Sequence, residues 1–369
     1  MGRAFSTYLD LVRFVAACLV YLWHSNMRLL VEDKLPASGY GHSAVTVFFV
    51  LSGLVIAYAT DTKEKTWIDY SASRLSRVYS VVIPAIILTP LLDAAGRVLY
   101  PELYAYPWDR FALRIAGCTL MLNEAWFISI TYFSNVPYWS IAFEFWYYVL
   151  FGLSMFLPRP LRLPAVIGCA VLIGPKLLLL LPVWWSGVVL YRWRWLQQRS
   201  LGFAWALVVV SSTGIVLMHW LDLYHVWPKQ LEHLIGTALH TNLTFARFFP
   251  ADYLLGALVF CNFAGMRIVA PTIEPLLTPL EKPVKVLAGY TFTLYLLHQP
   301  LLLFWTAVVR GDPKGHGFWV IVTLLTALSV WAIGHFTEQK RLPLRRALQR
   351  LFQRLSLALR RPAAAPDGA

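Results

Sequence analysis

The chain has 369 residues, of which 58% are hydrophobic and only 14% are charged, and its mean hydropathy is +0.58. A soluble domain has roughly 45–50% apolar and roughly 25% charged residues, so this composition excludes an ordinary soluble protein and indicates an integral membrane protein. The net charge of +13 comes from short basic clusters between apolar runs, a pattern that the positive-inside rule explains and that argues against nucleic-acid binding.

Eight apolar runs are long enough to cross a bilayer as helices, which takes about 20 residues each. In chain order they are 8–28, 42–60, 78–96, 138–157, 202–220, 248–265, 285–308 and 317–336. Two shorter runs lie between residues 164 and 192, and Gly174-Pro175 predicts a tight turn between them. Segment 111–128 is apolar but contains Asn123 and Glu124, and we expect it to be re-entrant. The sequence therefore predicts an all-α, polytopic transmembrane helical bundle of about ten membrane-spanning helices.

The basic clusters also predict an orientation. With ten crossings, both termini are cytoplasmic and most Lys and Arg residues lie on that side, as expected in a bacterial cytoplasmic (inner) membrane. Residues 1–338 then form the transmembrane domain, and residues 339–369 form a basic amphipathic cytoplasmic tail. Leu344, Leu348 and Leu351 of this tail share one helical face, which is typical of a helix on an anionic membrane surface. Pro362–Ala369 is expected to be disordered.

The first apolar run contains two ionisable residues, Arg13 and His24, with ten residues between them. An ionisable residue inside a membrane helix usually faces the bundle interior and has a function. Eleven positions make about three helical turns, so both side chains lie on one face, about 16 Å apart along the axis. Arginine suits phosphate recognition and histidine suits general-base catalysis. The alternative is that Arg13 snorkels to the cytoplasmic surface and His24 is a polar group at the outer interface.

Five short blocks follow one another in an order that resembles the family 3 membrane acyltransferases. They are Arg13 with His24, Phe48-Phe-Val-Leu-Ser-Gly53, Arg74-Leu-Ser-Arg77, Tyr138-Trp-Ser-Ile-Ala-Phe-Glu144 with Tyr147 and Tyr148, and Tyr290-Thr-Phe-Thr-Leu-Tyr295-Leu-Leu-His298-Gln-Pro300. The resemblance implies an enzyme, an O-acyltransferase that moves an acyl group, by default acetyl, from acyl-CoA to a carbohydrate hydroxyl. One departure is Ala44-Val45-Thr46, where the family commonly has Gly-Val-Asp.

The resemblance also implies roles for particular side chains. His24 would be the general base, and Glu144 would orient His24 or bind the sugar. Arg74 and Arg77, three residues apart and so on one helical face, would hold the phosphates of acetyl-CoA, with Arg13 further along the donor path. The candidates for acceptor binding are Trp139, Ser140, Tyr148, Asp252 and His298.

Each of these assignments has an alternative. Arg74 and Arg77 also fit an ordinary positive-inside flank, and Glu144 fits a structural partner for an intramembrane Arg or Tyr. Trp139 fits an interfacial aromatic anchor, and His298, two residues before a proline, fits a packing and kink position.

No metal site is expected from the histidines or the cysteines. His219, His225, His233 and His240 are six, eight and seven residues apart, which does not match the spacing of ligand pairs on one helix face. The four cysteines lie in apolar runs, where free Cys usually behaves as a small hydrophobe.

Three functions remain open from the sequence. The leading one is acylation of an extracytoplasmic or lipid-linked carbohydrate, with a carbohydrate or glycolipid acceptor and the bilayer as partners. The second is acylation of a hydrophobic secondary metabolite such as a macrolide. The third is a transporter or flippase for a glycan or an acyl carrier, against which the lack of an evident internal repeat counts modestly.

Overall fold

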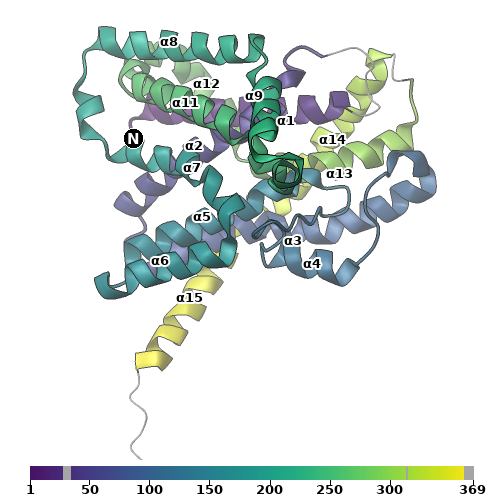
Figure 1. Cartoon of the computed structure of the whole chain (residues 1–369), viewed down its shortest axis with the longest axis horizontal. Coiled ribbons are helices and arrows are strands. Elements are labelled where there is room, and N and C mark those ends of the chain that lie inside the picture. Colours follow the sequence, from purple (N-terminus) through teal and green to yellow (C-terminus); the bar gives the residue numbers. More distant parts are fainter. Residues whose placement is uncertain (28–34, 313–314, 361–369) are drawn as a thin grey trace, which may run out of the picture.

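The computed structural model describes residues 1–27, 35–312 and 315–360. The regular secondary structure of this part is helical apart from one isolated bridge between Tyr132 and Asn135 (Figure 1). The all-α prediction is therefore confirmed. The predicted disordered end, Pro362–Ala369, lies outside the described residues.

The helices are joined mostly by short loops and 3₁₀ turns. They are α1 Arg3–Met27, α2 Gly41–Thr62, α3 Trp67–Leu99, α4 Phe111–Thr119, α5 Trp139–Phe156, α6 Arg159–Ile173, α7 Pro175–Arg192, α8 Leu201–Trp220, α9 Leu223–Ile235, α10 Thr237–Asn242, α11 Phe249–Val269, α12 Glu274–Ala288, α13 Thr291–Val309, α14 His316–Phe336 and α15 Arg341–Arg360.

Seven segments of the described chain are long and apolar enough to cross a membrane. They contain α1, α2, α3, α8, α11, α13 and α14. The chain is thus a polytopic membrane protein. The three further crossings predicted from the sequence correspond to α5, α6 and α7, which have 18, 15 and 18 residues, fewer than the about 20 of a full crossing. The ten-crossing topology with two cytoplasmic termini therefore stays a prediction.

Two helix boundaries differ from the sequence prediction. The run 285–308 is not one helix, because α12 ends at Ala288 and α13 begins at Thr291. Helix α3 begins at Trp67, where the Thr66 side chain accepts a hydrogen bond from the Asp69 backbone N–H, well before the apolar run at 78–96. Since α3 has 33 residues, it is about 50 Å long. Arg74 and Arg77 lie near its beginning.

The two segments in which the apolar pattern is interrupted, 111–128 and 164–192, contain helices that end in turns or loops. Gly174, with a φ of 80°, separates α6 from α7, which confirms the predicted tight turn. In segment 111–128 only the nine residues of α4 are helical, and a helix of that length spans about 13 Å. The loop that follows is pinned by Lys176, whose Nζ donates to Glu124 Oε2 and to Ile128 O, both at 2.5 Å.

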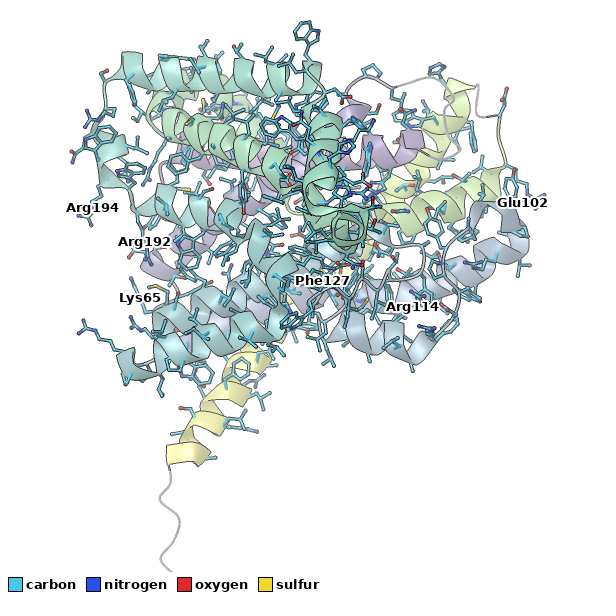
Figure 2. The ribbon with its side chains drawn as sticks, viewed as in Figure 1. Lys65, Glu102, Arg114, Phe127, Arg192 and Arg194 are labelled. Atoms are coloured by element: carbon cyan, nitrogen blue, oxygen red, sulfur yellow. The ribbon has the colours of Figure 1, made fainter. Side chains whose placement is uncertain are left out.

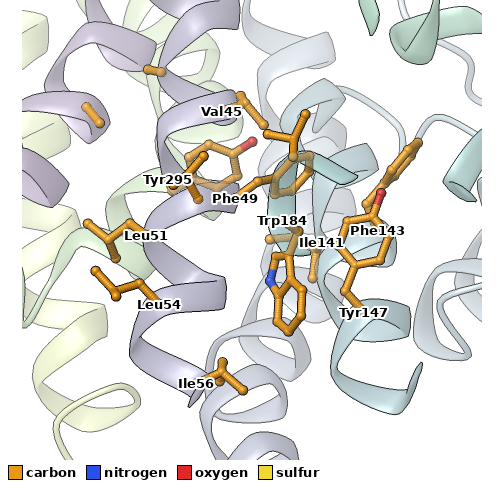
Figure 3. Packing of buried hydrophobic residues seen from close by; sticks show 14 of the residues in the cluster. Val45, Phe49, Leu51, Leu54, Ile56, Ile141, Phe143, Tyr147, Trp184 and Tyr295 are labelled. Atoms are coloured by element: carbon orange, nitrogen blue, oxygen red, sulfur yellow. The ribbon is translucent and has the colours of Figure 1, made fainter. Parts of the chain in front are cut away.

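Helix α2 lies inside the bundle and packs closely against α7. A Cβ atom on Gly53 would come within 2.0 Å of Trp184 O, and one on Gly187 within 2.0 Å of Val50 O. Only glycine at both positions allows the two backbones to approach this closely. Large side chains fill the space on either side of this contact, and Figure 3 shows Phe49, Tyr147 and Trp184 packed around it.

The tail forms helix α15, which leaves the bundle beside α3 (Figure 1). Gln349 Nε2 donates to Asp69 Oδ1 at 2.9 Å, and the rings of Trp67 and Phe352 are 5.7 Å apart. Leu351, which we expected on the apolar face, is 49% exposed. The tail helix is therefore docked on the beginning of α3 through its Phe352 side.

Candidate active site

One cavity collects most of the residues that the sequence analysis selected. They are Arg13 from α1, Arg74 and Arg77 from α3, and Ser140, Glu144 and Tyr148 from α5. Helices α2 and α13 complete the wall with Ser52 and Tyr295 among others. Five helices, three from the start of the chain and two from later segments, thus contribute polar side chains to one cavity within an apolar bundle.

Glu144 is held by hydroxyl groups on one side of this cavity. Ser52 Oγ donates to Glu144 Oε1 at 2.6 Å, and Tyr148 OH donates to the same oxygen. Trp184 Nε1 in turn donates to Ser52 Oγ at 3.1 Å. Within the described part of the chain, no hydrogen bond or ion pair of Glu144 reaches His24. The structure therefore gives no support to Glu144 as the group that orients His24.

The arginines of the cavity differ in how their charge is balanced. Arg13 pairs with Asp10 at 3.0 Å, and Arg74 pairs with Glu64 at 2.5 Å, the two latter side chains being only 11% and 5% exposed. The second oxygen of Glu64 and the Nε of Arg74 are buried and have no hydrogen-bond partner among the described residues. Arg77 makes no hydrogen bond or ion pair with any residue that the structure describes. Since an unpaired charge inside a membrane protein is unfavourable, this wall suits an anionic ligand.

His24 and His298 form a hydrogen-bonded imidazole pair. His298 Nδ1 lies 3.0 Å from Leu294 O and 2.8 Å from Tyr295 O, so it carries the proton and leaves Nε2 as an acceptor. His24 Nδ1 then donates to His298 Nε2 at 3.1 Å, and it also lies 2.9 Å from Val20 O. In a neutral His24 with its proton on Nδ1, Nε2 is the ring nitrogen that can accept a proton.

Tyr295 connects the cavity with the imidazole pair. Its side chain lines the cavity and its hydroxyl lies 2.5 Å from Ser140 Oγ, while its ring is 6.3 Å from that of His298. Its backbone carbonyl is also one of the two acceptors for His298 Nδ1. The cavity and the histidines are therefore neighbouring parts of one region between α1, α5 and α13.

Trp139 and Asp252 lie in a separate cluster around His42. Asp252 is 1% exposed and accepts hydrogen bonds from Thr46 Oγ1 at 2.7 Å, Tyr224 OH at 3.0 Å and His42 Nε2 at 3.3 Å. The ring of Trp139 is nearly parallel to that of His42, 6.1 Å away. Thr46 occupies the position where the family commonly has Asp. In this chain the carboxylate beside that position belongs to Asp252 of α11.

Several residues of this region were not selected from the sequence. Ser52 and Tyr295 lie inside blocks that carry the resemblance, and their place in those blocks was the available signal. Glu64 and His42 lie outside every block. Glu64 stands between Lys63 and Lys65 in a basic stretch, so nothing local indicates that it is buried against Arg74.

The histidines of the 219–240 region make other contacts. Ser43 Oγ donates to His219 Nε2 at 2.6 Å, and His219 stacks on Tyr40 with ring centroids 4.1 Å apart. His225 is exposed and pairs with Asp222 at 2.5 Å. Among the described residues there is no group of three or more His, Cys, Asp or Glu placed to hold a metal ion.

Comparison with known protein families identifies the family to which the chain belongs. The model of the acyltransferase 3 family, described as an acyltransferase domain, matches residues 6–335, which is nearly the whole chain. The chain belongs to acyltransferase family 3. This acyltransferase thus joins an enzyme family of membrane proteins, as the five sequence blocks predicted.

Two curated proteins show what the acyltransferase is similar to. It is 29% identical over 132 residues to the exopolysaccharide production protein ExoZ of Rhizobium meliloti (strain 1021), covering 35% of the chain and 38% of that protein. It is 27% identical over 168 residues to the acyltransferase MdmB of Streptomyces mycarofaciens, covering 43% and 41%. The acyltransferase therefore spans less than half the length of each relative. No solved structure matches it.

Proposed function

We propose that this protein is a membrane O-acyltransferase that moves an acyl group, by default acetyl, from acyl-CoA to a hydroxyl of an extracytoplasmic or lipid-linked carbohydrate. The observation that supports the proposal is one cavity lined by three arginines, whose Tyr295 neighbours the hydrogen-bonded His24–His298 pair. A carbohydrate acceptor is supported by the similarity to a protein named for exopolysaccharide production.

The arginines bind the donor in this proposal. Arg74 and Arg77 hold the phosphates of acyl-CoA, because guanidinium groups form strong charge-assisted hydrogen bonds with phosphate oxygens. The pantetheine arm then follows the cavity past Arg13 toward His24. Arg13 and His24 are about 16 Å apart by helix rise, and a pantetheine arm is of similar length. The donor enters from the cytoplasm, and the acceptor meets it near the outer leaflet.

His24 acts as the general base. Its Nε2 takes the proton of the acceptor hydroxyl as the oxygen attacks the acyl carbon. A carbon–oxygen bond forms, the carbon–sulfur bond breaks, and CoA leaves as the thiolate, which receives the proton from His24. His298 is a positioning residue, since its Nε2 accepts from His24 Nδ1 and so keeps the reactive nitrogen unprotonated.

The remaining selected residues shape the acceptor side. Ser140, Glu144 and Tyr148 form the polar wall of the cavity, and Trp139 and Asp252 lie at the beginnings of α5 and α11. Under the ten-crossing topology both of these helices begin outside, so we assign Trp139 and Asp252 to the outer entrance through which the carbohydrate arrives.

The test is acyl-CoA turnover by the purified protein in lipid nanodiscs. We expect CoA release from acetyl-CoA in the presence of an oligosaccharide acceptor, and no release by the His24→Ala variant. In parallel, mass spectrometry of surface glycans should show an acyl mass difference between strains with and without the gene. Transfer to a hydrophobic small molecule but not to saccharides would favour the secondary-metabolite alternative. Transport of a labelled glycan without CoA release would favour a transporter.

A further inference from the structure

Arg341, the first residue of α15, lies near the three arginines that line the cavity. The positive charge of its guanidinium interacts with the charges of Arg77, Arg74 and Arg13. It is half-buried, and among the residues that the structure describes it forms no hydrogen bond or ion pair. Arginines from three helices, α1, α3 and α15, therefore lie close to one another.

Contacts just before α15 fix where Arg341 lies. Glu338 Oε2 accepts from both the backbone N–H and the Oγ1 of Thr293, each at 2.9 Å. The two residues that precede Thr293, Thr291 and Phe292, line the cavity. Arg341 follows Glu338 by three positions, so the start of α15 is attached to the part of α13 that forms the cavity wall.

The body of α15 is attached to the helix that carries the other donor arginines. Gln349 Nε2 donates to Asp69 Oδ1 at 2.9 Å, and Phe352 contacts Trp67 with ring centroids 5.7 Å apart. These contacts hold α15 on the first turns of α3, directly before Arg74 and Arg77. The position of Arg341 thus depends on helix packing at two sites and not on a loose chain end.

The nearby carboxylates leave positive charge in excess. Asp10 pairs with Arg13, and Glu64 pairs with Arg74. Glu338 lies close enough to Arg77 and Arg341 to interact with their charges, but its Oε2 accepts hydrogen bonds from Thr293. One carboxylate therefore faces two guanidiniums that form no ion pair within the described chain. Such a surplus in a largely buried place suits a ligand with several negative charges.

We propose that Arg341 is a donor-binding residue and that α15 closes the nucleotide end of the donor site, with phosphates of CoA held between Arg341 and Arg77. This inference rests on the proposed function. It gives the tail a role beyond attraction to lipid, because Arg341 is half-buried near Arg77 while Arg346 and Arg350 of the same helix are exposed.

The experiment measures binding of unacylated CoA to the full-length protein in nanodiscs of neutral phosphatidylcholine, by isothermal titration calorimetry. Arg341→Ala should raise the Kd for CoA about tenfold, as expected for loss of one charge-assisted hydrogen bond. Arg341→Lys, which keeps the charge, should lose less. The matched control Arg346→Ala, which removes an exposed arginine from the same helix, should bind CoA as the wild type does.

The outcomes separate the two proposals. If the wild type binds CoA and both Arg341→Ala and Arg341→Gln bind it equally well, this inference is wrong and the proposed function stands. An effect of Arg341→Ala that matches that of Arg346→Ala, or that occurs only with anionic lipid, also overturns it, because the tail would then act on the membrane surface. If the wild type binds no CoA, the proposed function itself fails. Size-exclusion profiles and thermal unfolding identify any variant that does not fold, and Arg341→Gln or Arg341→Lys then takes its place.

Discussion

His24 Nδ1 lies 3.1 Å from His298 Nε2, so a nitrogen of α1 is hydrogen-bonded to one of α13, 274 residues further along the chain. Because His298 gives its own Nδ1 proton to backbone carbonyls of α13, it can only accept from His24. In this pair His24 is therefore the donor and His298 the acceptor. In the proposed mechanism His24 reacts with the acceptor, and His298 positions His24.

We predict that His24→Ala abolishes acyl transfer while the protein remains folded and inserted, with kcat at least about 100-fold lower, since a general base contributes about 10²–10⁴-fold. His298→Ala should lower kcat less and leave the KM for acyl-CoA nearly unchanged, because only the orientation of His24 is disturbed. Steady-state kinetics on both variants check this. Near-normal turnover by His24→Ala would remove it from the role of base.

Arg77 is expected to act in donor binding. Arg77→Ala should raise the KM for acyl-CoA about tenfold with a smaller effect on the acceptor KM, because a ground-state phosphate contact is lost. Arg159, an exposed arginine at the start of α6, provides the control, and Arg159→Ala should leave both values unchanged. Equal effects of the two substitutions would indicate a general charge effect.

Glu64 is expected to compete with the donor for Arg74. Its carboxylate lies 2.5 Å from Arg74 Nη2, where a phosphate oxygen would lie during donor binding. Glu64→Gln should therefore lower the Kd for CoA several-fold, and it should also lower the thermal unfolding temperature because a buried ion pair is broken. A weaker affinity for CoA in Glu64→Gln would mean instead that Glu64 holds Arg74 in its binding geometry. The exposed Glu102→Gln is the control.

The topology makes a prediction for three exposed residues. Figure 2 shows Lys65 and Arg194 at one end of the molecule and Glu102 at the opposite end. Cysteine at position 65 or 194 should react with a membrane-impermeant maleimide only from the cytoplasm, and cysteine at position 102 only from outside. The background should carry serine at the four native cysteines. Labelling of position 65 from outside would reverse the donor path.

The ion pair between Lys176 and Glu124 predicts a stability effect. Both side chains are almost completely buried, with 0% and 1% exposure. Lys176→Met leaves the Glu124 carboxylate without its partner and should cost about 3–5 kcal/mol, whereas the double variant with Glu124→Gln should recover much of this. Thermal unfolding in detergent measures both. Equal stability of the single and double variants would contradict a coupled pair.

The helices and most of the polar residues of the cavity could be predicted from the sequence because both follow local patterns. Apolar runs identify the spanning helices, and Arg13 and His24 lie on one face of α1 by their spacing alone. The break between α12 and α13 was missed, because apolar residues continue across Gly289 and hydropathy does not register a change of helix.

Pairings between distant residues could not be predicted in the same way. The partner of Thr46 is Asp252, 206 residues away, and the partner of His24 is on α13. The burial of Glu64 against Arg74 depends on how α2 and α3 pack. The local sequence, a glutamate between two lysines, gives no information about that packing. Such contacts depend on tertiary packing rather than on any periodicity.

Ser52 and Gly53 are adjacent residues with different tasks. Ser52 binds Glu144 and Trp184 Nε1, whereas Gly53 lets the backbone of Trp184 come close. A methyl group at Gly53 would push α7 outward and draw the indole away from the serine, so the polar wall would be altered without any change in a polar residue. A mutational screen that measured only product formation would therefore class Gly53 with the catalytic residues. Its actual contribution would be the close approach of α2 and α7 that it allows.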